Sequence, residues 1–215
     1  MGQADNSDSA PTPVVDEDAR ADRRGAKRFM TILRVGKLVT SGQQRLCLIR
    51  NISSSGLMAH VYAPHAVGDK VEIELKADQP LRGEIVWVRD EHIGVRFDGQ
   101  IEVQDILTGR TTIEGRKPRA PRIEVEARAR VKVDNTVYRV AVRDISQGGI
   151  CIDLDEPLKQ GDDAVVTVDG MEQMSAIVRW CHEGQVGLSF IKPVAFDDLI
   201  RWLDEQDGEE RPATA

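Results

Sequence analysis

Asn51-Ile52-Ser53-Ser54-Ser55-Gly56 returns 93 positions later as Asp144-Ile145-Ser146-Gln147-Gly148-Gly149. The same offset then relates Gly68 to Gly161, Trp87 to Trp180, Gly94 to Gly187, Phe97 to Phe190 and Asp105 to Asp198. This period is too long for a solenoid repeat and has the length of a small domain. The sequence therefore predicts one domain that has been duplicated.

The residue pattern within each copy indicates short antiparallel strands. Val71-Glu72-Ile73-Glu74-Leu75 alternates apolar and charged residues, which is typical of a strand with one buried face. Glu84–Val88 and Ile93–Phe97 read as a hairpin. Each copy closes on a helical pattern, clearest for the apolar face that Phe196, Leu199, Ile200 and Leu203 form. We predict a mainly β protein of two tandem small antiparallel β-barrels, each with a short C-terminal helix.

Composition divides the chain into five segments. We expect a disordered acidic tail over residues 1–19, a first domain over 20–107, a linker over 108–121, a second domain over 122–203 and a disordered acidic tail over 204–215. The tails carry −5 and −4 of the formal net charge of −7, so residues 20–203 carry +2. Such a weakly basic core argues against a nucleic-acid-binding protein.

Other classes of protein are also disfavoured. The three cysteines, Cys47, Cys151 and Cys181, lie in apolar, strand-like surroundings and are expected to be reduced thiols. No apolar run has the length of a membrane span, and no signal peptide or catalytic motif is present. We expect a cytoplasmic protein that is not an enzyme, has no metal site and no cofactor, and does not insert into a membrane.

One polar pattern in the first copy indicates a particular kind of binding site. Arg24-Gly25-Ala26-Lys27-Arg28 gives Arg-x-x-x-Arg, and Asn51-x-Ser53-x-x-Gly56 follows 23 residues after Arg28. With the later Ile85-Val86-Trp87 and Ile93-Gly94-Val95-Arg96-Phe97, this chain resembles the PilZ family, bacterial receptors for cyclic di-GMP. The resemblance covers residues 20–107 and 116–203. It implies a ligand site made by Arg24, Arg28, Asn51, Ser53 and Gly56.

These residue types suit that ligand, which carries two phosphodiesters and two guanines. A guanidinium group binds a phosphate or the O6/N7 edge of guanine with two parallel hydrogen bonds. An amide or carboxylate oxygen accepts hydrogen bonds from guanine, and a serine hydroxyl is small enough to contact either group. Gly56 and Gly149 would permit a positive φ or a close approach to the ligand.

Simpler interpretations apply to each element alone. An arginine-rich segment before a strand is usually a solvated linker. Asn-x-Ser-x-x-Gly is an ordinary turn whose side chains bond their own backbone. Trp87 and Trp180 are interpreted as barrel packing. The two halves of the motif at the correct separation are what favours the ligand site.

The second copy departs from the pattern. Asp144, Ser146 and Gly149 keep the acceptor motif, but no two arginines of Arg116-Lys117-Pro118-Arg119-Ala120-Pro121-Arg122 are four positions apart. Prolines also stiffen this segment. A second, weaker site would comprise Arg119, Arg122, Asp144, Ser146 and Gly149. We therefore expect binding mainly in the first domain.

The leading hypothesis is a cytoplasmic receptor that binds cyclic di-GMP and relays it to an unidentified protein partner. The resemblance implies outputs such as motility, polysaccharide production or biofilm control. A ligand-independent adaptor for protein–protein interaction is the alternative. Nucleic-acid binding by the small barrels is the weakest of the three hypotheses.

Overall fold

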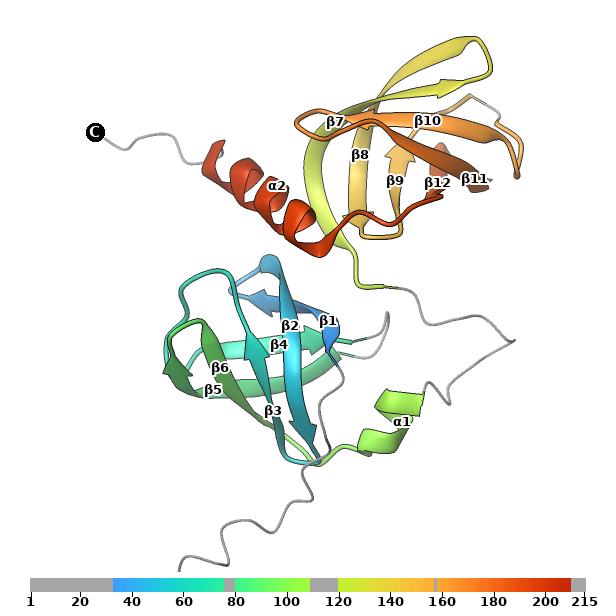
Figure 1. Ribbon diagram of the computed structural model, residues 1–215. Helices are drawn as coiled ribbons and strands as arrows, with labels where there is room; N and C mark the ends of the chain where they lie inside the picture. The colour runs from blue at the N-terminus through green and yellow to red at the C-terminus, as the bar shows by residue number, and fades with distance from the viewer. Residues whose placement is uncertain (1–32, 76–79, 109–119, 157, 210–215) are drawn as a thin grey trace, which may run out of the picture.

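Alternating apolar and polar residues build two six-stranded antiparallel sheets, each of which closes into a barrel (Figure 1). The structure is a computed structural model that describes residues 33–75, 80–108, 120–156 and 158–209. The predicted fold class is confirmed. The two barrels have the same strand order, since β1-β2-β3-β6-β5-β4 corresponds strand by strand to β7-β8-β9-β12-β11-β10.

The first six strands and a short helix form barrel 1. Its elements are β1 (Arg34–Thr40), β2 (Gln43–Ser53), β3 (Gly56–His60), β4 (Lys70–Glu74), β5 (Pro80–Arg89), β6 (His92–Phe97) and α1 (Val103–Thr108). Pairing of β1 with β4 closes the sheet. Leu38, Ile73, Ile85 and Ile93 fill the interior and are almost completely buried. Because side chains occupy the interior, a ligand can bind only on the outer wall or across an end.

Barrel 2 repeats this plan. Its elements are β7 (Ile123–Val133), β8 (Thr136–Ser146), β9 (Gly149–Asp153), β10 (Asp163–Val168), β11 (Met174–His182), β12 (Gln185–Phe190) and α2 (Phe196–Glu209). Strand β7 alternates strictly from Ala127, with Ala129 and Val131 inside and the intervening basic residues exposed. Pairing of β7 with β10 closes this sheet.

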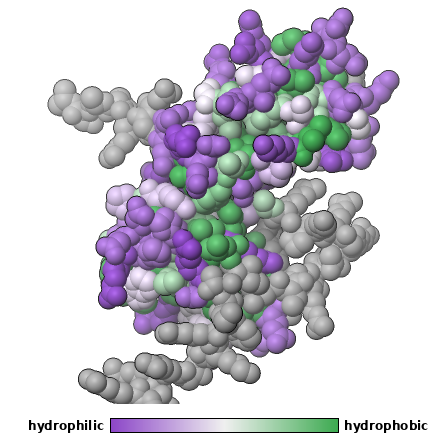
Figure 2. Space-filling model, viewed as in Figure 1, coloured by the Kyte–Doolittle hydropathy of each residue, from purple (hydrophilic) through white to green (hydrophobic). Residues whose placement is uncertain are grey.

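Helix α2 lies where the two barrels meet (Figure 1). Leu46 projects outward from barrel 1 and is buried in the hydrophobic cluster of barrel 2, together with Ile200. The Tyr62 ring meets the Phe196 ring edge-on at a centroid distance of 5.7 Å, and Arg45 lies 3.7 Å from the Asp204 carboxylate. Figure 2 shows hydrophobic residues gathered at this junction. The barrels therefore share an apolar interface.

Helix α2 corrects one expectation about the C-terminus. Residues 204–209 were predicted to belong to a disordered tail, but α2 continues to Glu209. Two acidic residues in its first turn, Asp197 and Asp198, suit the positive end of the helix dipole. Beyond Leu203 the helix still faces barrel 1, where Asp204 approaches Arg45. Composition alone could not show this contact.

Each barrel carries a tryptophan on its outer wall, laid across a glycine of the next strand. Trp87 pairs with Gly94 and Trp180 with Gly187. A Cβ atom on either glycine would overlap the indole ring. Trp87 is 40% exposed and is not part of the barrel core. Trp87 therefore packs on the outside of the barrel wall and not in its interior, because a bulge between Ile85 and Trp87 shifts the alternation and turns the indole outward.

The buried Cys47 thiol predicts a pH dependence of stability. Burial raises its pKa from 9.0 to about 12. Above pH 9 the unfolded thiol loses its proton while the folded thiol keeps it, so stability falls as the pH rises from 9 towards 12. We expect urea unfolding of Cys47→Ala to show a shallower loss of stability over this range. Equal slopes for the wild type and the variant would contradict the prediction.

The tryptophan–glycine contact predicts the effect of a single methyl group. Gly94→Ala should displace the Trp87 indole into solvent, shift the tryptophan emission to longer wavelength and lower stability by about 1 kcal/mol. Gly99→Ala is the matched control, because a Cβ at Gly99 meets no atom within 4 Å. Unchanged emission in Gly94→Ala would show that the ring is not held against this glycine.

Candidate functional site

The polar motif of barrel 1 occupies the hairpin between β2 and β3. A bulge between Ile49 and Asn51 breaks the regular pairing of these strands just before the motif. Bulges of this kind redirect the side chains that follow them. Asn51 is consequently exposed on the outer wall.

Strand register aligns the motif with the exposed tryptophan. Asn51 pairs with Met58, Met58 pairs with Gly94, and Gly94 pairs with Trp87. These four residues therefore form one row across β2, β3, β6 and β5. Since Gly94 has no side chain, the Trp87 indole lies flat against the wall over Gly94. The row therefore brings the Asn51 amide and the partly exposed Trp87 ring to the same part of the outer wall, with Met58 between them.

A shallow hollow of about 330 Å³ follows this row. Its lining includes Asn51, Ser53, Met58, Trp87 and Arg96. The hollow therefore combines an apolar floor with an amide, a hydroxyl and a guanidinium group at its rim, which suits a flat polar ring that also bears a negative charge.

The charges next to the hollow leave Arg96 largely available. Arg96 Nη2 lies 3.8 Å from Glu84 Oε2, and its side chain is 66% exposed. Glu84 is held more closely by Lys70, whose Nζ donates to the same carboxylate oxygen at 2.8 Å. That hydrogen bond lowers the pKa of Glu84 and keeps it ionised. The distant Arg96–Glu84 contact allows the guanidinium group to turn towards an anion.

Ser53 and Gly56 have structural roles in the hairpin. Ser53 Oγ donates to the Gly56 carbonyl oxygen at 3.1 Å, as the turn interpretation of the motif predicts. Gly56 does not have a positive φ, so of the two expectations for this residue only a close approach to the ligand remains. It is required because a Cβ atom would collide with the Val95 carbonyl oxygen of β6. Gly149 is placed in the same way against Leu188 of β12, also without a positive φ.

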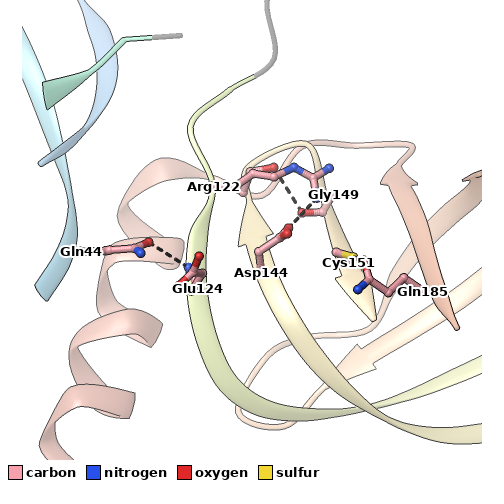
Figure 3. Close-up of polar contacts among 8 residues, drawn as sticks. Gln44, Arg122, Glu124, Asp144, Gly149, Cys151 and Gln185 are labelled. Carbon is pink, nitrogen blue, oxygen red and sulfur yellow. Dashed lines mark hydrogen bonds and ion pairs between the residues drawn. The ribbon is translucent and has the colours of Figure 1, made fainter. Parts of the chain in front are cut away.

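The corresponding site in barrel 2 is closed by its own arginine. Arg122 Nη1 lies 2.5 Å from Asp144 Oδ1, and Figure 3 shows the Arg122 side chain pointing at this carboxylate. Ser146 Oγ donates to the Gly149 carbonyl oxygen at 3.2 Å, and Ser146 is only 4% exposed. The acceptor motif of barrel 2 is therefore already engaged within the chain.

Barrel 2 also differs from barrel 1 at other positions around the hollow. Cys151 pairs with Asp144 in the place of Met58 and contacts the Gln185 side chain (Figure 3). Burial raises the pKa of the Cys151 thiol, and Asp144 raises it further. Ser189 stands where barrel 1 has Arg96. Barrel 2 thus lacks the rim cation of the barrel 1 hollow.

The structure brings together only part of the predicted site. Asn51, Ser53 and Gly56 lie at the hollow, and Arg122, Asp144, Ser146 and Gly149 lie close together in barrel 2. Arg24, Arg28 and Arg119 lie outside the described residues. Met58, Trp87 and Arg96 also line the hollow, although they were not predicted as site residues. Arg96 had a usable signal, because it alternates with the apolar Val95 and Phe97 in a predicted strand.

The described residues contain no group of three or more His, Cys, Asp or Glu side chains that could hold a metal ion. No helix in that part of the chain is both long and apolar enough to span a membrane.

Solved structures similar to this chain share little sequence with it. The Borreliella burgdorferi PlzA protein, solved in complex with c-di-GMP, is 12% identical with a TM-score of 0.33, and the alignment covers 85% of this chain and 95% of PlzA. The Bacillus subtilis inhibitor of motility (MotI/DgrA) is 14% identical with a TM-score of 0.36, covering 84% and 100%. Escherichia coli YcgR, in complex with c-di-GMP, is 15% identical with a TM-score of 0.34, covering 82% and 86%.

The family comparison is more decisive. No curated protein matches the chain. The model of the PilZ domain, however, matches twice, over residues 22–112 and 116–205. The two matches cover almost the whole sequence and fall one on each barrel. The chain therefore belongs to the PilZ domain family and carries two PilZ domains in tandem.

Proposed function

We propose that this protein is a cytoplasmic receptor that binds cyclic di-GMP through barrel 1 and relays the signal to a protein partner. The observation that carries the proposal is the hollow on barrel 1, where Asn51, Ser53 and Arg96 surround the exposed face of Trp87. The Arg24-x-x-x-Arg28 segment stands at the family's separation upstream of this hollow.

Each group has a chemical task with this ligand. The Trp87 indole offers a flat surface on which a guanine can stack, a contact worth about 1–3 kcal/mol per base. The Asn51 amide oxygen accepts from the guanine N1–H or N2–H group. Arg24, Arg28 and Arg96 would hold the phosphodiesters and the O6/N7 edges of the guanines. The hollow itself supplies one stacking surface, so the upstream arginines are needed to complete the site.

The corresponding residues of barrel 2 are less suited to bind the ligand, which favours barrel 1 as the binding site. A ligand approaching Asp144 would have to displace Arg122, which is already bonded to that carboxylate. Removing a partner from a partly buried charge is costly unless the ligand replaces it. Arg119, Arg122, Asp144, Ser146 and Gly149 are therefore at most the weaker site. We also propose a first domain over 20–107, a linker over 108–121 and a second domain that begins at residue 122 and includes α2 to Glu209.

The position of the arginines suggests how binding is relayed. Arg24 and Arg28 precede β1 in the chain, so a ligand held on the outer wall of β2 and β3 would draw the upstream segment against barrel 1. That movement would change the surface that barrel 1 presents to a partner. The alternative function, an adaptor that needs no ligand, predicts the same barrels without this response.

Calorimetry of the full chain with cyclic di-GMP tests the proposal. We expect heat of binding from the wild type and an affinity at least about tenfold lower for each of Arg24→Ala and Arg28→Ala, because each variant loses charge-assisted hydrogen bonds. Arg116→Ala is the matched control and should bind like the wild type. The absence of heat from the wild type would favour the adaptor, and full affinity in Arg24→Ala/Arg28→Ala would move the site to barrel 2.

The acceptor residue provides a second, independent prediction. Asn51→Asp should tighten binding several-fold, since a carboxylate accepts the guanine hydrogen bonds more strongly than an amide. Asn51→Ala should weaken it. Asp144→Asn, the reciprocal change in barrel 2, should leave the affinity unchanged when measured by the same titration. Weaker binding by Asp144→Asn would instead assign a role to barrel 2.

A further inference from the structure

The outer faces of β1–β2 and β7–β8 are structurally equivalent. The register pairs Lys37 with Leu46 in barrel 1 and Arg130 with Arg139 in barrel 2, at the same offset of 93 residues. Val35 of barrel 1 likewise corresponds to Arg128. The duplicated fold therefore offers the same face twice, with different side chains on it.

Barrel 1 uses this face to dock against barrel 2. Leu46 is buried in the hydrophobic cluster of barrel 2, and Val35 packs against the same cluster. Helix α2 contributes Ile200 to the same cluster. Its Asp204 reaches Arg45, which pairs with the buried Leu38 and so lies on the other side of β2 from Leu46. On barrel 1, then, the face is covered by an apolar cluster to which a helix contributes.

On barrel 2 the same face is basic and open. Arg128, Arg130, Lys132 and Arg139, here called the basic face, are all exposed. None of the four forms an ion pair with any residue in the ranges that the structure describes. A hollow of about 760 Å³ lies on this face, lined by Arg128, Arg130 and Arg139 and bordered by Asp169.

This concentration of positive charge is unfavourable for barrel 2 by itself. Arg130 and Arg139 stand directly opposite each other across β7 and β8, and like charges in that position destabilise a sheet. Residues 120–206 otherwise have an acidic balance, with sixteen Asp and Glu against ten Lys and Arg. Four of the ten basic residues gather on this one face, so their distribution requires an explanation other than solubility.

We propose that the basic face is a docking surface for an acidic helix of another protein. A helix of this chain contributes Ile200 to the cluster that covers the equivalent face of barrel 1, so a helix can reach a face of this geometry. Arginine forks bind carboxylates with two parallel hydrogen bonds. The proposal goes beyond cyclic di-GMP binding and does not depend on it.

Nucleic acid suits this face less well. A helix about 10 Å wide can contact the basic face alone, whereas a duplex extends over the acidic surroundings of barrel 2. The face also has no exposed aromatic side chain, among the residues that the structure describes, on which bases of a single strand could stack. Charge and size therefore favour a helix with carboxylates along one side.

The test titrates the full chain with an alanine-based helical peptide of about 18 residues that carries Glu along one side. Its counterpart has Gln at the same positions. We expect the Glu peptide to bind at low salt, the Gln peptide to bind at least tenfold more weakly, and Arg139→Glu to reduce binding of the Glu peptide at least tenfold. Arg139→Glu should also raise the melting temperature, because the introduced carboxylate would face Arg130 as an opposite charge.

The two readouts of this variant separate docking from folding. A loss of binding together with a higher melting temperature cannot come from misfolding. Lys192→Glu, an equal change of charge on an exposed residue of barrel 2 away from the face, should bind like the wild type. Equal binding of the Glu and Gln peptides, or full binding by Arg139→Glu, overturns the proposal. Tighter binding of duplex DNA than of the Glu peptide would reassign the face to nucleic acid.

Discussion

Closure of the two sheets is the constraint from which the other features follow. Pairing of β1 with β4, and of β7 with β10, leaves neither barrel with a free edge. Every second side chain must then point into a small interior that is already filled with aliphatic residues. A ligand can consequently bind only on the outer wall or across an end, and on the wall the strand register decides which side chains become neighbours.

The fold could be predicted because its signals are local and occur twice. Alternation as in Val71–Leu75 identifies strands, and the equal offset between Trp87 and Trp180 identifies the duplication. The hairpin motif was also located correctly, since Ser53 and Gly56 belong to a turn that joins consecutive strands. Such features can be recognised from residues that are close together in the sequence.

The missed features depend on contacts between distant strands. The row from Asn51 to Trp87 crosses four strands, and two bulges set its alignment. No periodicity reveals a bulge, so the sequence does not show that Trp87 packs on the outside of the wall. Arg122 was recognised only as part of a degenerate motif, although the structure shows it bonded to Asp144. Helix α2 was predicted too short because the residues after Leu203 are mostly polar and acidic, and composition does not show that Asp204 approaches Arg45 of barrel 1.

The differences between equivalent faces also bear on assembly. A repeat protein in which every unit presents an apolar face to the next unit has no natural last member. Had barrel 2 kept the leucine and valine of barrel 1 in place of Arg139 and Arg128, each molecule could add to another and extend into a filament. Arg128 and Arg139 replace that apolar pair, and burying unpaired guanidinium groups against an apolar cluster is costly. The substitutions that make the face basic therefore also remove the apolar junction from barrel 2.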